Sequence, residues 1–140
     1  MSFAYFEVTA EVGIRAKGSS YEEAFAEAAK GLFELMVDTS EVHPLEKKFV
    51  RACSESLDLL LADWLNQLIV ERDRSGFVFS EFRVRINKNS QGWKIETVAM
   101  GEFLNRERHD PRIDVKAVTY NGLKCYEQEG IYTVECVLDV

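Results

Sequence analysis

Hydrophobic residues recur at helical spacing in two stretches of this chain. The first stripe follows Ser20 and comprises Tyr21, Phe25, Ala28, Ala29, Leu32, Leu35 and Met36. The second comprises Leu57, Leu60, Leu61, Trp64, Leu65, Leu68 and Ile69, and Arg74-Ser75-Gly76 closes it. Ser20 and Glu23 have the spacing of a capping box, which starts a helix. The pattern predicts two amphipathic helices, each with an apolar face directed into a core.

Alternating apolar and polar residues mark much of the remaining chain and predict six to eight strands. The expected strands are residues 3–9, 11–16, 45–52, 82–86, 93–99, 113–120, 123–127 and 131–139. One face of the strand 113–120 would hold Ile113, Val115, Ala117 and Thr119. Asn121-Gly122 is a favoured hairpin pair and predicts a chain reversal. We therefore expect a single α+β domain over residues 1–140, with two helices packed on a largely antiparallel sheet.

Composition narrows the classes of function. The chain carries 17 basic and 24 acidic residues, a net charge of −7. A negative protein is poorly suited to direct, strong nucleic-acid binding, because phosphate neutralisation supplies most of the non-specific affinity. No apolar run is long enough for a membrane span, and the N-terminus lacks the pattern of a secretory signal. We expect a soluble cytoplasmic protein, with any RNA held by a partner.

Standard catalytic motifs are absent from the sequence. The three cysteines, Cys53, Cys125 and Cys136, form no CxxC pair and no zinc-ligand spacing with histidine. We expect Cys53 and Cys136 to be buried, because their neighbours are apolar. The chain has no glycine-rich phosphate loop, no GxSxG and no HExxH. These absences favour a non-catalytic accessory protein over an enzyme.

Two acidic residues stand out by their placement at strand ends. Glu11 interrupts an apolar extended stretch, and Asp139 ends an apolar strand one residue before Val140. Carboxylates among apolar neighbours are stabilised by a positive partner, and a hard divalent cation takes carboxylate and carbonyl oxygens. The residues alone also fit two unrelated surface carboxylates, since nothing in the sequence places Glu11 beside Asp139.

A second candidate region runs from Gly101 to Leu123. The expected strand that carries Lys116 follows a charged loop, which contains Glu102, Arg106, Arg108 and His109. Polar groups on a loop anchored by a strand can form a contact site. An ordinary solvated loop beside an ordinary strand fits the same pattern.

Several strings in this order resemble the archease family. They are TAEVGIRA (9–16), EEAF (22–25), LMVDTSEV (35–42), LLADWLNQLI (60–69), FSEF (79–82), the GE…RH.P…VKAVTY.GL stretch (101–123) and the terminal LDV. The resemblance implies an accessory protein of an RtcB-type RNA ligase that promotes ligase guanylylation. In this step, a ligase histidine takes GMP from GTP, and multiple turnover follows in tRNA splicing and RNA repair.

The same resemblance implies a site. The family's metal-binding positions fall on Glu11, Asp139 and Val140, with Asp38 as a further ligand or supporting group, and calcium is the expected ion. The family's His-Thr-Ala-Asp reads Val8-Thr9-Ala10-Glu11 here, so the carboxylate is one methylene longer and the polar histidine is lost. Lys116, His109, Arg106 and Glu102 would contact the ligase.

Two other functions stay open at this point. One is a chaperone-like modulator of an RNA-modifying enzyme, such as a tRNA methyltransferase, which would depend on an exposed apolar surface. The other is a metal-dependent hydrolase that uses Glu11, Asp38 and Asp139 with His109.

Overall fold

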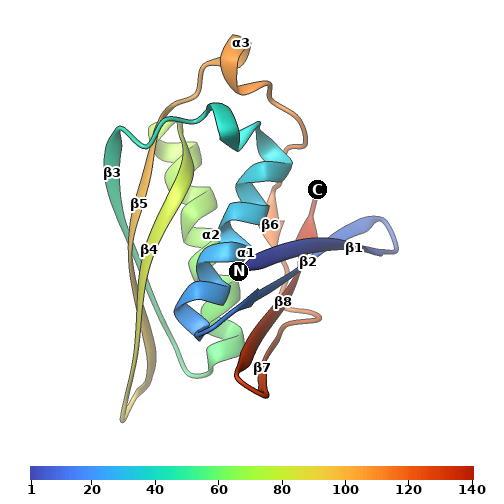
Figure 1. Cartoon of the computed structure of the whole chain (residues 1–140), viewed down its shortest axis with the longest axis vertical. Helices are drawn as coiled ribbons and strands as arrows, with labels where there is room; N and C mark the ends of the chain where they lie inside the picture. Colours follow the sequence, from blue (N-terminus) through green and yellow to red (C-terminus); the bar gives the residue numbers. More distant parts are fainter.

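The computed structural model describes residues 1–140 as two helices held between two antiparallel sheets (Figure 1). The larger sheet has the order β1-β2-β8-β6, with β7 also paired to β8, and the smaller has the order β3-β5-β4. The strands are β1 (Ser2–Val8), β2 (Glu11–Gly18), β3 (Glu46–Ser54), β4 (Phe77–Asn89), β5 (Gly92–Phe103), β6 (Ala117–Val118), β7 (Lys124–Gln128) and β8 (Ile131–Asp139). The helices are α1 (Tyr21–Met36), α2 (Leu57–Ser75), the short α3 (Arg106–His109) and the 3-10 turn η1 (Thr39–Glu41). The α+β class is confirmed, with two sheets around the helices.

Helix α1 contacts both sheets because its two faces carry side chains of different size. On one face, a Cβ at Gly31 would lie 2.9 Å from the Phe3 ring and 3.4 Å from Ile14, so the larger sheet approaches closely. On the other face, the Phe33 ring packs on Phe79 and Phe82 of β4. Small residues toward one sheet and aromatic residues toward the other place the helix in the middle layer.

The first turn of α1 differs slightly from the expected capping box. The Ser20 hydroxyl accepts from the Glu23 N–H at 3.1 Å, as the motif requires. The Glu23 carboxylate does not return to the Ser20 N–H; it accepts from Ser19 and from the terminal ammonium of Met1. Three donors therefore share this carboxylate, and the hydrogen bond from the terminal ammonium lowers the pKa of Glu23 to about 2.

Helix α2 packs its apolar stripe against both sheets and ends at Gly76. Trp64, Leu65 and Leu68 are fully buried. Gly76 has φ 77°, the left-handed conformation common after a helix. The Asn66 amide accepts from the Val118 N–H at 2.8 Å and donates to the Val118 carbonyl at 3.0 Å. This pair of bonds joins α2 to the short strand β6.

The segment 113–120 differs from the expected half-buried strand. Only Ala117–Val118 forms a strand, and Ile113, expected on the buried face, is 42% exposed. The preceding stretch instead crosses the end of α1, where Arg112 and Ile113 donate their N–H groups to Met36 and Leu35 carbonyls. Side chains along this stretch follow the helix end and not a strand pleat, so the period-two prediction fails there.

The expected hairpin at Asn121-Gly122 is also wrong. Strands β6 and β7 do not pair with each other, because both pair with β8, β6 at Leu138–Asp139 and β7 at Ile131–Glu135. Residues 119–123 therefore bulge out of the ladder, and β7 then continues along β8 in the same direction as β6. The reversal lies at Glu129-Gly130, where both residues have positive φ, as a two-residue hairpin requires.

Burial of Cys136 is confirmed, but that of Cys53 is wrong. Cys53 is exposed because it lies on the outer face of β3, whereas Cys136 points into the core from β8.

Candidate functional site

The ladder between β2 and β8 brings Glu11 and Asp139 to the same end of the larger sheet. Its last pair is Val12 with Leu138, so Glu11 and Asp139 are the next residue on each strand. Directly opposite residues of an antiparallel pair point to the same face. Since Ile14 and Leu138 are fully buried, this alternation places the two carboxylates on the outer face.

Val8 and Val140 complete the surroundings of Glu11. Val8 is the register partner of Glu11 across the β1–β2 turn, and Val140 lines one shallow depression together with residues 7–12. The residue at the family's histidine position therefore lies beside the first carboxylate, but it is apolar. Ala10, at the tip of the turn, has φ 59°, a conformation that costs a non-glycine residue about 1–2 kcal/mol.

Lys116 is held next to Asp139 through the main chain. Its N–H donates to the Asp139 carbonyl at 2.9 Å, and the following residue, Ala117, is the register partner of Asp139. The Lys116 side chain is exposed and forms no ion pair. One exposed sheet end therefore carries Glu11, Asp139, Lys116 and the terminal Val140.

Asp38 is engaged elsewhere. Its carboxylate caps η1 by accepting from the N–H and hydroxyl of Ser40, at 3.1 and 2.6 Å. The hydrogen bond from the Ser40 hydroxyl lowers the pKa of Asp38. The Asp38 N–H donates to the His109 carbonyl, so this residue belongs with the loop around α3. No three His, Cys, Asp or Glu side chains gather closely enough to form a ligand set by themselves.

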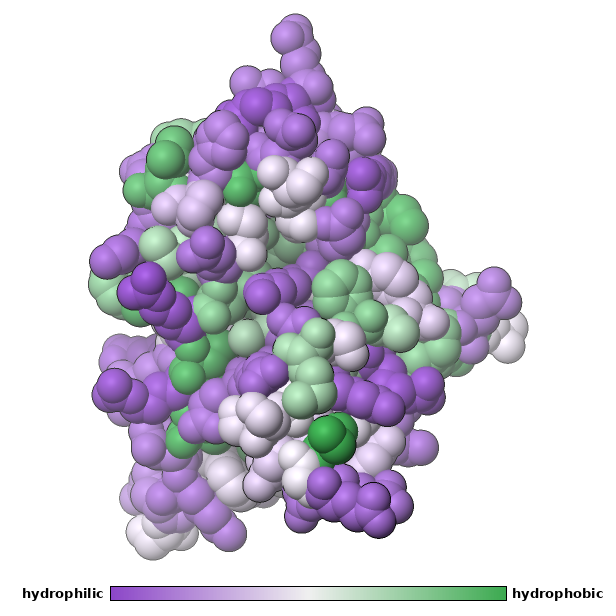
Figure 2. Space-filling model, viewed as in Figure 1, coloured by the Kyte–Doolittle hydropathy of each residue, from purple (hydrophilic) through white to green (hydrophobic).

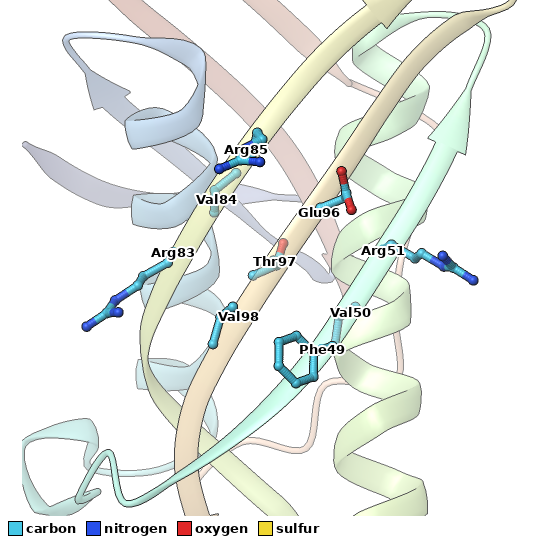
Figure 3. Close-up of a pocket in the computed structure, with 9 residues that line it drawn as sticks. All are labelled: Phe49, Val50, Arg51, Arg83, Val84, Arg85, Glu96, Thr97 and Val98. Atoms are coloured by element: carbon cyan, nitrogen blue, oxygen red, sulfur yellow. The ribbon is translucent and has the colours of Figure 1, made fainter.

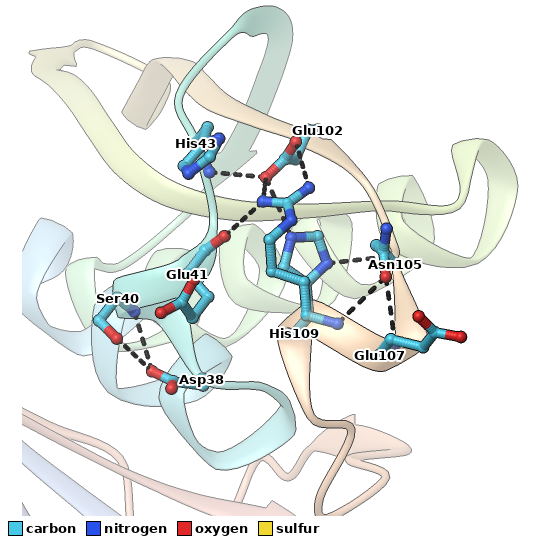
Figure 4. Close-up of polar contacts among 9 residues, drawn as sticks. Asp38, Ser40, Glu41, His43, Glu102, Asn105, Glu107 and His109 are labelled. Carbon is cyan, nitrogen blue, oxygen red and sulfur yellow. Dashed lines mark hydrogen bonds and ion pairs between the residues drawn. The ribbon is translucent and has the colours of Figure 1, made fainter.

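Glu102 is the centre of a buried polar network beneath α3 (Figure 4). Arg108 donates to both carboxylate oxygens, at 2.7 and 3.0 Å, and the His43 N–H donates to Oε2 at 2.7 Å. The Arg108 bonds are the largest cause that holds the pKa of Glu102 far below its ordinary value, against the opposing effect of burial. The carboxylate is therefore ionised, and both of its oxygens are hydrogen-bonded to groups of the protein itself.

His109 is fully buried and has a defined tautomer. Its Nδ1 accepts from the Asn105 N–H at 2.8 Å, so the proton lies on Nε2, which is 3.0 Å from Glu102 Oε2 and donates to it. The Asn105 side chain also caps α3 by accepting from Glu107 and Arg108. Neutral histidine thus links the end of β5 to α3.

Of the four residues expected to contact a partner, the structure leaves two on the surface. Lys116 and Arg106 are exposed, whereas His109 and Glu102 are enclosed in the network. A role of His109 and Glu102 in partner contact stays a prediction, and it would require the loop to open. The surface around α3 is strongly hydrophilic (Figure 2).

Sequence reasoning placed Arg108 in the candidate loop but not in this network, and it missed Asn66. Arg108 joins Glu102 to the Glu41 carbonyl, to which it donates at 2.7 Å, and Asn66 holds β6 beside α2. Their only signal was a charged residue in a loop and a polar residue on a helix flank. A helix-flank asparagine is usually solvated, so the second could not be distinguished from its neighbours.

Comparison with known proteins gives a family match over nearly the whole chain. The model of the Archease protein family matches residues 3–140. A protein archease of Thermococcus kodakarensis is 43% identical over 120 residues, which cover 86% of this chain and 84% of the relative. One of Methanothermobacter thermautotrophicus is 38% identical over 138 residues, covering 99% of this chain and 98% of the relative.

Solved structures share the fold. The solution structure of protein 1598 of Methanobacterium thermoautotrophicum superposes with a TM-score of 0.87 at 37% identity, over 99% of each chain. The crystal structure of a Thermotoga maritima archease, described as a possible chaperone, gives a TM-score of 0.61 at 23% identity, over 96% of this chain and 94% of that one. In this chain no helix combines the length and apolar character needed to cross a bilayer. The family match over nearly the whole length, and the relatives above 30% identity, show that this chain belongs to the archease family.

Proposed function

We propose that this protein is a non-catalytic activator of an RtcB-type RNA ligase and acts through the sheet end that carries Glu11 and Asp139. The observation that supports the proposal most is the adjacency of these two carboxylates on the outer face, beside Lys116 and the chain terminus. A small, exposed, charged tip suits insertion toward the active site of a larger enzyme. Glu11 and Asp139 are the end residues of β2 and β8, and the Lys116 main chain is bonded to Asp139, so the sheet fixes where these residues lie.

The donor set fits a hard cation in part. Glu11, Asp139 and the main-chain oxygen of Val140 supply oxygen ligands only, the type that calcium prefers. Calcium takes six to eight such ligands, so water or groups of the partner would complete the shell. Val8 adds no donor, and Asp38 is used by Ser40. A bound cation would supply positive charge opposite the ligase-bound triphosphate.

Lys116 adds a second contribution that needs no metal. The Lys116 main chain is bonded to that of Asp139, and its exposed side chain forms no ion pair, so the ammonium group is free to bind a phosphate or a carboxylate of the ligase. Asp139 and Lys116 together present opposite charges to the partner at one place. This arrangement favours one docking orientation over others.

The test is a time course of ligase guanylylation with labelled GTP. Wild type should accelerate the covalent step, and Asp139→Asn, Glu11→Gln and Lys116→Ala should each reduce the acceleration. Glu129→Gln is the matched control, because Glu129 is exposed at the opposite end of β8. Equal rates with and without the wild-type protein would defeat the proposal. Calcium titration of the same variants by calorimetry tests the cation separately.

A chaperone-like role toward an RNA-modifying enzyme, such as a tRNA methyltransferase, has one specific observation in its favour. Leu45 and Phe103, at neighbouring ends of β3 and β5, are 71% and 61% exposed. Light scattering of the methyltransferase would separate the two roles. Protection that is lost in Leu45→Ser/Phe103→Ser but kept in Asp139→Asn would favour this alternative.

A further inference from the structure

We propose that the outer face of the β3-β5-β4 sheet binds single-stranded RNA weakly. This proposal rests on the proposed function: RNA would bind this second face while the sheet end with Glu11 and Asp139 contacts the ligase. This face turns away from the helices, so none of its side chains is needed for the core (Figure 1). The register of β3 and β4 against β5 defines which side chains it carries.

The face is positive although the chain is negative. It carries five basic side chains: Lys47, Arg51, Arg83, Arg85 and Lys94. Only Glu81 and Glu96 oppose them, which gives a local charge of +3 within a chain of net charge −7. The acidic residues are thus concentrated elsewhere, and this face attracts a polyanion although the chain as a whole repels one.

Three arginines on this face have no polar partner within the protein. Arg51, Arg83 and Arg85 are exposed, and none of them takes part in an ion pair or a side-chain hydrogen bond. Glu96 stands between Arg51 and Arg85 in one cross-strand row, yet its only ion pair is with Lys94, at 3.9 Å. Guanidinium groups bind phosphates through paired N–H donors, and these three have their donors available.

An aromatic ring lies among the arginines. Phe49 is 77% exposed, the highest value of any large apolar side chain here. Figure 3 shows the Phe49 ring nearly face-on between Arg83 and Arg51, whose side chains point away from it in opposite directions. These residues and Val98 line an open hollow of about 730 Å³. An exposed ring face on an open sheet, flanked by guanidinium groups, is the arrangement on which unpaired bases stack.

A single-stranded nucleic acid fits this face better than an acidic protein segment. An acidic segment would use the arginines but would have no group that needs a flat, uncovered ring. A duplex would use the charges, but its bases are already stacked. Weak affinity is sufficient, because a ligase that holds the RNA nearby raises its effective concentration.

Fluorescence anisotropy with a labelled oligouridylate 12-mer tests the proposal without any ligase. We expect saturable binding with a Kd of about 10⁻⁴ M at 50 mM KCl, in the range of non-specific binding. Phe49→Ala should weaken binding at least about fivefold, the lower limit of what one base stack contributes. Arg83→Gln/Arg85→Gln should weaken it and reduce the slope of log K against log salt by about 1.4. Glu96→Gln should strengthen binding, because it removes a negative charge that repels the RNA phosphates.

The control is Lys17→Gln/Lys124→Gln. It removes the same charge from two exposed lysines of the larger sheet that form no ion pair. Thermal unfolding of each variant checks that the fold is kept. No saturable binding up to about 10⁻³ M protein, or no effect of the Phe49 and arginine changes, would overturn the proposal. Equal displacement by polyglutamate would also overturn it, in favour of an acidic protein partner. Guanylylation needs no RNA, so its stimulation can succeed or fail independently of this result.

Discussion

Replacing Glu102 by glutamine should strongly destabilise the fold without changing the volume of the side chain. Oε2 accepts three N–H groups, from Arg108, His43 and His109, while Oε1 accepts one, from Arg108 Nη2. The best glutamine orientation keeps its oxygen toward the three donors. Its NH2 group must then face Arg108 Nη2, donor against donor, in a site where residue 102 is only 9% exposed.

The magnitude follows from the number of bonds affected. One hydrogen bond to a charged group is lost, which costs about 1.5–3 kcal/mol, and the other three lose their charge assistance. We expect a total loss of about 3 kcal/mol in the free energy of unfolding, measured in urea at pH 7. Glu46→Gln is the control, because Glu46 is exposed, pairs with Gly101 on the same ladder and forms no ion pair. This control should change stability by less than about 0.5 kcal/mol.

The pH dependence supplies a second, independent check. The pKa of Glu102 is lowered in the folded state relative to the ordinary value of 4.5. Its contribution is therefore complete above the unfolded-state pKa and is lost as the pH falls toward the folded-state pKa. The stability gap between wild type and Glu102→Gln should stay constant from pH 8 to about pH 6 and narrow below about pH 4.5. A gap under about 1 kcal/mol at pH 7, or one that widens on acidification, would refute this account of the network.

Three further predictions concern other parts of the molecule. Ala10→Gly should raise the free energy of unfolding by about 0.5 kcal/mol, because glycine adopts the positive φ without strain and this gain exceeds its extra unfolded-state entropy; a decrease in stability would contradict it. Asn66→Ala should lower the free energy of unfolding by about 1–3 kcal/mol, because two bonds to the β6 main chain are lost, and hydrogen exchange should show β6 opening first. Cys53 should react first with a thiol reagent at pH 8, whereas burial raises the pKa of Cys125 and raises that of Cys136 to about 12, so mass spectrometry that finds either of them labelled before Cys53 would be inconsistent with the structure.

The helices and most strands could be predicted because their apolar periods are regular over many residues. The stripe of α2 repeats from Leu57 to Ile69, and the observed helix includes all of it. The segment 113–120 could not be predicted, because its buried residues Val115 and Val118 are set by contacts with α1 and β8 from distant parts of the chain. Likewise, Asn121-Gly122 has hairpin chemistry, but β8 already offers a partner to both flanking strands.

The candidate site was predictable only in part. Glu11 and Asp139 were selected by position and resemblance, and their adjacency depends on a ladder between the second and last strands, which single-sequence patterns do not define. The positive outer face arises from three strands that are separated in sequence. Arg83 and Arg85 alternate visibly with apolar residues, but Phe49 and Arg51 join them only through β5.

The hairpin of β1 and β2 is stiffened by two side chains that stack over a glycine. A Cβ at Gly13 would lie 2.2 Å from the Phe6 ring, so the absent side chain lets this ring rest on the neighbouring strand, and the Arg15 guanidinium covers it at 5.0 Å from the centroid. A hairpin braced in this way has little conformational entropy to lose in the proposed contact with the ligase. Under the proposed function the entropic cost of association is therefore small, and Phe6→Ala, which loosens the hairpin, would weaken the complex even though every charge of the Glu11 and Asp139 sheet end is kept.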